Sequence, residues 1–561
     1  MHGLGHGKVT LALCLFGLSQ SGCNIVQGFV DAGDAVFPDE KNYFDAPGFR
    51  LVAGEYRALE FAAGESLYLL ARPAAVDDFS LHVMRYADPR PCVLPNINAH
   101  TGGVGVFLDA TTIAYTEEGT EHGTLRFADG NCHTYDFSLP GSGLPLVETP
   151  EGFVVNEGRT MLMVNPVTGT RRTIASEARY VAYFSGFYVV FSMGRIGAFK
   201  SDWREAGWFG NGVVDIGGAG SSFFYEDSGG IHRLTAASAD SVTDTVIAAN
   251  GCNLGFARNI GSAENWVSYY SPCDAKKLIV YSESVSRASP LDVPADPDFM
   301  AFLPDHPSQS GDPAVDQFFI FYLTEVNARA GTGRLMMRTP DRQTKDLGQN
   351  AAWERLTAFP SAAETHGFAL VDVNGDTGRF VRWESNGQVE PIAEGVVRGT
   401  GDLVTNFDGE TGQFALPTEG GFSVVSRRVP PHGFKTRDPK GRWTAFIDDY
   451  RDKIGTLAIS KSSLDFTEAA RTPAAPPLRD VIAYNVLWDW RARFVPAIPG
   501  LAYFSNYDPV NDVGRLDYRN LELQFTATIS EGVATYLETP GSLVYSVPYG
   551  SGAGIWVVRS R

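Results

Sequence analysis

The chain has 561 residues, of which 65 are acidic and 46 are Lys or Arg, and its formal net charge is −19. This charge argues against nucleic acid and anionic lipid surfaces as partners, because bulk electrostatics would repel both. Hydrophobic residues make up 44% of the chain. The chain can therefore bury a large core, and its length exceeds what one core usually fills.

The first 22 residues have the layout of a secretory signal. A basic residue, Lys8, precedes an apolar stretch from Val9 to Leu18, and the small residues Ser21 and Gly22 follow. The apolar stretch is too short to span a bilayer, and small residues at its end are typical of a cleavage site. We therefore expect residues 1–22 to be removed as a signal peptide and the protein to be exported.

Cys23 comes directly after these small residues. The run Ser21-Gly22-Cys23 resembles the lipobox of bacterial lipoproteins, in which the cysteine is lipidated and becomes the first mature residue. The resemblance implies a lipid anchor at Cys23, and Asn24 after it favours the outer membrane. No other run of about 18 apolar residues occurs, so we expect the lipid to be the only membrane attachment. The alternative is an ordinary secretory signal followed by an incidental cysteine.

The next segment, residues 23–54, mixes Gly, Asp and Pro with little periodicity and is expected to be a tether. From residue 55 onward, short apolar or β-branched runs alternate with Gly, Asp, Asn and Pro, which is typical of strands and turns. The nearest approach to a helix is TEAARTPAAPPLRDV at 467–481, whose prolines forbid more than a turn or two. The sequence therefore predicts an almost entirely β protein.

The strands follow a repeated phrase, an apolar run, a turn rich in Gly or Asp, and a second apolar run. GFALVDVNGDTGRFVRWESNG at 367–387 is one of about twelve such phrases, spaced about 35 to 60 residues apart. A repeat of this period with about four short strands per unit is typical of β-propeller blades. One blade has two apolar faces and becomes stable only between neighbours, so a ring follows. A β-sandwich would also have short strands, but it would not repeat one phrase.

The last phrases resemble TolB-type, WD-repeat-like propeller repeats. Tyr503-Phe504-Ser505-Asn506 with Gly514, and Tyr545-Ser546 with Gly554-Ile555-Trp556, carry the resemblance. It implies the propeller fold and protein–protein contacts in the cell envelope, although a fold does not define an activity.

The number of rings stays open between two arrangements. Twelve blades exceed the usual four to eight of one propeller, which favours two tandem rings over 55–290 and 291–561, with a junction near 284–299. In the alternative, several phrases pair within one blade, and a single ring of seven or eight blades results. A strand near Tyr56–Phe61 is expected to complete the last blade, beside the C-terminal GIWVVRSR.

Two of the six cysteines are assigned to the signal (Cys14) and the lipid site. The other four allow three pairings, namely those among Cys92, Cys132, Cys252 and Cys273. Pairing between near neighbours, Cys92–Cys132 and Cys252–Cys273, is the simplest, because each pair flanks one local unit. A metal site is disfavoured, since the spacing C-x₂-C is absent and no histidines cluster nearby.

Motifs of common enzymes are absent, including H-E-x-x-H, the P-loop and the nucleophile elbow. Ser551, in PYGSGAGIW, is expected in a hairpin turn. Asp448 and Asp449, and also Asp489 in LWDWRARF, lie near Trp, Tyr or Arg, as acids do in sugar-processing sites. Adjacent side chains on a strand point to opposite faces, so Asp448 and Asp449 cannot face each other without a bulge.

One motif resembles a calcium loop. DVNGDTG places Asp372, Asn374 and Asp376 at alternate positions, as in loops that surround Ca²⁺ with oxygens; NFDGETG around Asp408 has the same look. The alternative is a simple hairpin turn, which selects the same residues. No other cofactor is expected.

Four tryptophans form two short clusters, SDWREAGWFG and LWDWRARF. Rings at alternate strand positions share a face, so Trp203, Trp208, Trp488 and Trp490 could form a sugar- or peptide-binding platform. The alternative is packing between blades.

Together these features predict a non-catalytic, lipid-anchored β-propeller that binds an envelope protein or an extracellular polymer. The alternative is a propeller enzyme acting on an extracellular glycan or another polymer.

Overall fold

The computed structural model describes residues 48–559, except 63–65, 74–78, 86–87, 98–103, 107–111, 118–123, 130–132, 141–145, 150, 220, 260–264, 305–316, 360–364, 419–420, 462, 473–476, 489–491, 496–499 and 540–541. The described chain is almost entirely β-strand, with the single α-helix α1 (Phe466–Arg471). The predicted all-β class is confirmed.

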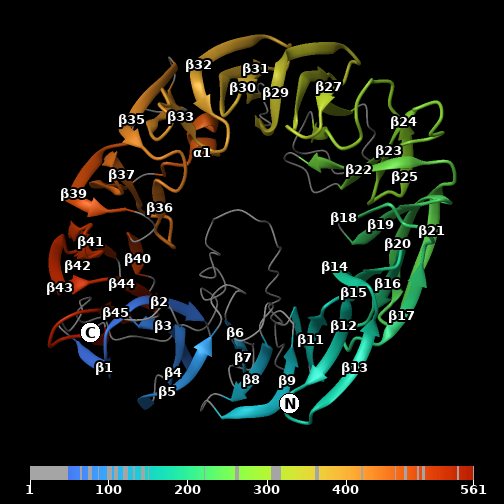
Figure 1. Ribbon diagram of the computed structural model, residues 1–561. Helices are drawn as coiled ribbons and strands as arrows, with labels where there is room; N and C mark the ends of the chain where they lie inside the picture. Colours follow the sequence, from blue (N-terminus) through green and yellow to red (C-terminus); the bar gives the residue numbers. More distant parts are fainter. Residues whose placement is uncertain are drawn as a thin grey trace, which may run out of the picture.

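The strands form twelve antiparallel units that follow one another around one ring, with the innermost strands near its centre (Figure 1). Four sheets have four strands each, two eight-stranded sheets hold two units each, the eleven-stranded sheet holds three, and one sheet has three strands. The predicted β-propeller architecture is confirmed.

The first six units occupy the N-terminal half of the ring. Their strands are β2 (Tyr56–Ala62), β3 (Ser66–Pro73), β4 (Phe79–Arg85) and β5 (Asp88–Ile97) in unit 1; β6 (Val104–Val106), β7 (Thr112–Glu117), β8 (Thr124–Asp129) and β9 (Thr134–Pro140) in unit 2; β10 (Val147–Thr149), β11 (Gly152–Glu157), β12 (Thr160–Asn165) and β13 (Thr170–Ala175) in unit 3; β14 (Ala178–Phe184), β15 (Phe187–Ser192), β16 (Arg195–Phe199) and β17 (Glu205–Phe209) in unit 4; β18 (Asp215–Ala219), β19 (Ser222–Asp227), β20 (Gly230–Ser238) and β21 (Ser241–Ala248) in unit 5; β22 (Cys252–Asn259), β23 (Trp266–Tyr270), β24 (Leu278–Ser282) and β25 (Arg287–Pro290) in unit 6.

The other six units complete the ring. Their strands are β26 (Met300–Pro304), β27 (Phe318–Asn327), β28 (Thr332–Arg338) and the first half of β29 (Thr344–Phe359) in unit 7; the second half of β29, β30 (His366–Asn374), β31 (Thr377–Glu384) and β32 (Val389–Val397) in unit 8; β33 (Leu403–Thr405), β34 (Gly412–Thr418) and β35 (Gly421–Val429) in unit 9; β36 (Lys435–Arg437), β37 (Thr444–Arg451), β38 (Ile454–Ser460) and β39 (Arg479–Leu487) in unit 10; β40 (Arg493–Val495), β41 (Gly500–Asp508), β42 (Val513–Asn520) and β43 (Phe525–Val533) in unit 11; β44 (Thr535–Thr539), β45 (Ser542–Val547), β46 (Gly554–Arg559) and β1 (Phe49–Ala53) in unit 12.

The N-terminal strand closes the ring, because β1 pairs with β46 as the outer strand of unit 12. This corrects two boundaries. The closing strand is Phe49–Ala53, whereas the expected strand near Tyr56–Phe61 belongs to β2, which opens unit 1. The segment expected as a tether therefore contains a strand near its end. The aromatic and apolar residues of β2 suit either place, and only the pairing decides between them.

The blades form one ring, so the expectation of two tandem rings is wrong. The alternative of one ring with seven or eight blades is also wrong in number, because this ring has twelve. The segment near 284–299 is no junction between separate rings. Trp266 of unit 6 stacks on Phe302 of unit 7, with ring centroids 4.9 Å apart, and β22 pairs with β26. Units 6 and 7 bury a shared cluster of apolar side chains, so the ring continues through this segment.

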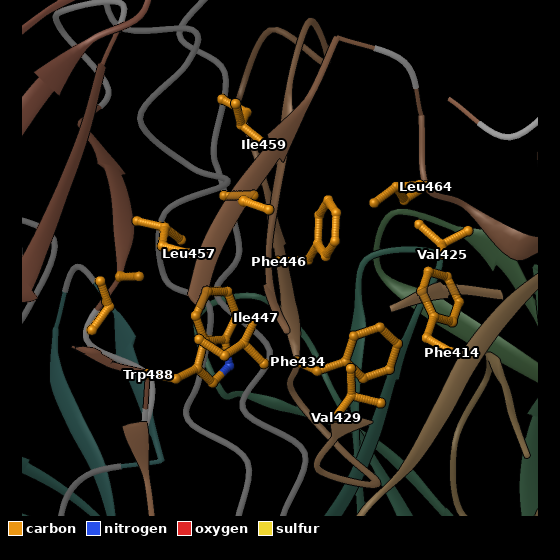
Figure 2. Packing of buried hydrophobic residues seen from close by; sticks show 14 of the residues in the cluster. Phe414, Val425, Val429, Phe434, Phe446, Ile447, Leu457, Ile459, Leu464 and Trp488 are labelled. Atoms are coloured by element: carbon orange, nitrogen blue, oxygen red, sulfur yellow. The ribbon is translucent and has the colours of Figure 1, made fainter. Parts of the chain in front are cut away.

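Packing between neighbouring blades forms the core. Figure 2 shows the cluster between units 9 and 10, where Phe414 and Phe434 lie with ring centroids 4.7 Å apart, near Phe446. All three rings are at most 2% exposed. Burying such side chains stabilises the fold by roughly 1.5–3 kcal/mol each. This burial therefore stabilises the contact between neighbouring blades.

Units 7 to 11 share a local feature in one hairpin each, namely β27–β28, β30–β31, β33–β34, β37–β38 and β41–β42. One residue has a positive φ, and it lies in the first strand of the hairpin or, in unit 9, directly after that strand. A glycine of the second strand lies opposite the carbonyl of the residue before it. The positive-φ residues and their glycines are Glu325 with Gly333, Asp372 with Gly378, Asn406 with Gly412, Asp449 with Gly455, and Asn506 with Gly514. A Cβ on these glycines would lie 2.7–3.3 Å from that carbonyl oxygen. The repeated Asp, Asn and Gly of the sequence phrase therefore mark one recurring bulge.

Unit 9 lacks the innermost strand within the described residues, and α1 packs on its strand β34. Phe466 of α1 contacts the rings of Phe368 and Phe380 in unit 8, at 5.7 and 5.5 Å. Asp465 caps the helix by accepting from Thr467 N. The expected limit of a turn or two is confirmed, since α1 has six residues.

Candidate functional site

The candidate site is a group of exposed or half-buried apolar and acidic side chains between units 4 and 7. We call it the acidic face and define it by Met193, Val214, Asp215, Glu226 and Asp298. Asp215 opens β18, and its Cα partner on β19 is Glu226. Like charges directly opposite each other on neighbouring strands destabilise a sheet. Asp215 and Glu226 thus repel each other at one register position, although the Glu226 carboxylate also accepts from Leu254 N over 3.0 Å.

The chain before β18 is fixed by three backbone hydrogen bonds. Asn211 N donates to Asp227 Oδ2 over 3.0 Å, Val213 N donates to Gly194 O over 2.8 Å, and Val214 N donates to Glu226 O over 2.9 Å. These bonds join the turns of units 4 and 5. They hold Val214 and Asp215 beside Glu226 in a defined position.

Asp227, which holds this connection, has further partners. Its Oδ1 accepts from Gly229 N over 2.7 Å and lies 3.1 Å from His232 Nε2. The other ring nitrogen, Nδ1, lies 3.2 Å from Asp244 Oδ1, and the ring stacks on Tyr225. Two carboxylates therefore flank one buried imidazole. The cluster braces the hairpin under the acidic face.

Two apolar side chains stand out from this face. Met193 is 70% exposed and Val214 is 74% exposed. Met193 also has a φ of 48°, a conformation that bulky residues seldom adopt. Single exposed apolar residues are common on protein surfaces. Here, however, the exposed Val214 directly precedes the acidic Asp215, so the face combines apolar contact with negative charge.

The carboxyl groups of this face have raised pKa values. Burial raises the pKa of Glu226, and the nearby Asp215 raises it further, against hydrogen bonds from the Leu254 and Asn253 backbones. The pKa of Asp298 is also raised, by burial first and then by Asp296 and Asp215. Among the described residues, no Lys or Arg forms an ion pair with Asp215, Glu226 or Asp298. Clustered acids with raised pKa values are typical of functional sites, and a cation would relieve their repulsion.

Several other buried carboxylates of the ring are paired with an arginine. These pairs are Glu283 with Arg233, Asp448 with Arg479, Asp517 with Arg515 and Glu538 with Arg493. Their charges are neutralised inside the protein, which suits a structural role. The acidic face differs from them in this respect.

Asp448 and Asp449, which the sequence suggested as candidate acids of a sugar-processing site, lie in different environments. Asp448 is fully buried and accepts from Ser426 Oγ over 2.9 Å and from Arg427 N over 2.7 Å. Asp449 is exposed, with a φ of 51°. One acid is therefore buried and the other exposed at the bulge of this hairpin, so the two do not form a facing pair. Asp489 lies outside the described residues.

The prediction that four tryptophans form a binding platform is wrong for Trp203 and Trp488. Trp203 is fully buried and stacks on Tyr188 with ring centroids 4.4 Å apart, and Trp488 is 4% exposed. Trp208 is half-buried against Phe199. Both buried rings pack between blades, because a large apolar ring gains most by leaving water. Trp490 lies outside the described residues.

The calcium-like segment forms the hairpin turn between β30 and β31. Asn374 pairs with Thr377 across this turn, and the Asp372 carboxylate forms an ion pair of 2.5 Å with Arg379. Asp376 is exposed. Within the described part of the chain, no group of three or more His, Cys, Asp or Glu residues has metal-binding geometry. The calcium site stays a prediction.

Cys252 and Cys273 form a disulfide in unit 6, as near-neighbour pairing predicted, with Cα atoms 5.5 Å apart. Cys92 lies in β5, whereas Cys132 and Cys23 lie outside the described residues, so these predictions stay open. Ser551 lies in the turn between β45 and β46, as expected. No described helix has the length and apolarity needed to cross a membrane.

Sequence reasoning did not find the acidic face. Met193 and Val214 look like core residues in the sequence, and the face's three carboxylates are among 65 acids. A signal did exist in VVDIGG at 213–218, where an acid interrupts an apolar run. Only the fold shows that the Val before this acid is exposed and that Asp298 lies near it.

Comparison with known proteins adds little. No family model matches the chain, and no curated protein matches it. Three similar solved structures are apo AztD from Citrobacter koseri, the dihydro-heme d1 dehydrogenase NirN in complex with DHE, and a streptogramin B lyase. AztD is 10% identical, with 60% of this chain and 94% of that chain covered and a TM-score of 0.27. NirN is 10% identical, with coverages of 80% and 77% and a TM-score of 0.27. The lyase is 7% identical, with coverages of 68% and 92% and a TM-score of 0.22. We draw nothing about the activity of this chain from these similarities.

Proposed function

We propose that this protein is a non-catalytic binding module of the bacterial cell envelope, exported and anchored by a lipid on Cys23. The Cys252–Cys273 disulfide supports export, because disulfides persist in oxidising compartments such as the periplasm and the cell surface. The lipobox-like run around Cys23 supports the anchor.

The observation that carries the binding role is the opposed pair Asp215 and Glu226 beside the exposed Val214. A partner with Lys or Arg next to apolar side chains would satisfy both parts of the acidic face. Charge complementarity of this kind gives specificity and speeds association. The partner is then a basic, partly apolar segment of an envelope protein.

The glycan-active alternative has less support. Of the three acids that it relied on, Asp448 is buried and paired with Arg479, so it is not available to a substrate in this structure. Asp449 is exposed, and Asp489 lies outside the described residues.

The test is cross-linking in cells followed by purification of the full-length protein from envelope fractions. The double variant Asp215→Asn with Glu226→Gln is expected to lose a stoichiometric partner that the wild type retains. Glu390→Gln with Glu394→Gln, two exposed acids on β32, changes the net charge equally and is expected to retain it. Equal loss in both pairs of substitutions would contradict the role of the acidic face. Separately, Cys23→Ala is expected to release the protein from membranes; retention there would contradict the anchor.

A further inference from the structure

We propose that β1 is an exchangeable strand, and that two copies of this protein pair by each placing its β1 on the β46 edge of the other. The inference goes beyond the binding role above and does not depend on it.

The first observation is that β1 is weakly embedded. It has five residues, none of them buried, and Phe49 is 37% exposed. Its pairing with β46 is interrupted by a bulge between Arg50 and Val52. Strands with little buried surface and irregular pairing open most easily.

The second observation is the short connection from β1 to β2. Only Gly54 and Glu55 lie between Ala53 and Tyr56, and Gly54 has a φ of 141°, which L side chains rarely adopt. Short hinges favour strand exchange, whereas longer ones let a strand fold back on its own chain.

The third observation is the surface that β1 covers. The β46 residues Ile555 and Val557 are 0% and 6% exposed, and both belong to a cluster with Leu51 and Val52 of β1. Without β1, β46 would be an unpaired edge with apolar side chains, which is a template for another strand.

The occupant that fits this edge best is the β1 of a second copy. It would restore each pair that the closed ring has, including Phe49 opposite Val557 and Arg50 opposite Trp556. It would also restore the cation–π contact of Arg50 with Trp556, at 5.9 Å. An exchange between identical chains therefore regains the contacts that it breaks, which makes it a low-cost route to a dimer.

The test uses the register of β1 and β46 in the full-length chain, purified in mild detergent. Arg50→Cys and Trp556→Cys are made in separate chains, which are mixed and oxidised. Neither chain can form this disulfide within itself, so a covalent heterodimer requires β1 of one chain on β46 of the other. The matched control mixes Arg50→Cys with Val510→Cys, a position that is 89% exposed and lies in the turn between β41 and β42, which do not pair with β1.

The expected result is at least tenfold more heterodimer in the Arg50→Cys and Trp556→Cys mixture than in the control. Insertion of Gly-Ser between Glu55 and Tyr56 is expected to lower that yield severalfold, because a longer hinge lets β1 return to its own ring. Equal yields in both mixtures, or no heterodimer while the Arg50→Cys/Trp556→Cys double variant cross-links within one chain, would overturn the proposal.

A measurement without substitutions covers the case in which the cysteine variants do not fold. Light scattering of the wild type after prolonged incubation over a hundredfold range of concentration is expected to show a dimer that increases with concentration. A monomer throughout that range would overturn the proposal equally.

Discussion

The recurring bulge of units 7 to 11 makes one substitution a sharp test of the packing. In unit 10, Gly455 is buried, and a Cβ there would lie 2.7 Å from Asp448 O and 2.7 Å from Ile447 Cγ1. Neither neighbour can move easily. Ile447 is fully buried, and the Asp448 side chain is held by Ser426 and by the Arg427 backbone.

We therefore expect Gly455→Ala to lower the free energy of unfolding. Overpacking of this kind costs about 1–3 kcal/mol. Replacing Gly by Ala also reduces the entropy of the unfolded chain, which returns about 0.4–1 kcal/mol. From the middle of each range, the net expectation is a loss of about 1.3 kcal/mol.

The matched control is Gly514→Ala in the same position of unit 11. There the nearest atom to a Cβ is Ser505 O at 3.3 Å, so a shift of a few tenths of an ångström accommodates the methyl group. We expect a change within about 0.5 kcal/mol. Urea unfolding followed by tryptophan fluorescence gives both values from the midpoints, provided that the slopes agree. The argument fails if Gly455→Ala is as stable as the wild type, or if both variants lose the same amount.

Three other predictions concern cross-links, charge and metal. Cys252→Ala with Cys273→Ala is expected to lower stability by about 3 kcal/mol, since the disulfide closes a loop with a sequence separation of 21; urea unfolding under non-reducing conditions measures it, and an unchanged midpoint would contradict the estimate. Asp298→Asn is expected to raise stability at pH 7 by about 0.5 kcal/mol, because burial, Asp296 and Asp215 raise the pKa of this carboxyl in the folded protein. The charged form is disfavoured only in the folded state, so the gain is complete above the raised pKa and disappears as the pH falls below the unfolded value of about 3.9; a gain that persists at pH 3 would refute this cause. Calcium at millimolar concentration is expected to leave the melting temperature unchanged, because the Asp372 carboxylate is paired with Arg379; a rise that Asp376→Asn abolishes would instead establish the calcium site.

Features that depend on nearby residues could be read from the sequence. The blade phrase predicted the propeller because an apolar run, a turn and a second apolar run fold as one hairpin wherever they occur. The prolines after Arg471 limited α1 in the same local way. The near-neighbour disulfide between Cys252 and Cys273 was likewise predictable, since both cysteines flank one hairpin.

The closure of the ring and the acidic face depend instead on residues that are distant in the chain. Phe49 pairs with Val557, and nothing in either segment distinguishes β1 from β2 as the closing strand. Trp203 and Trp488 could stack on a ligand or fill a core, and the neighbouring blade decides. Asp215 influences Asp298 only because unit 5 and the start of unit 7 lie close together in the ring. The sequence by itself determined the blade, since the contacts within a blade are local. Tertiary packing decided the number of blades in the ring, the strand that closes it and the side chains left in water, since those contacts join distant segments.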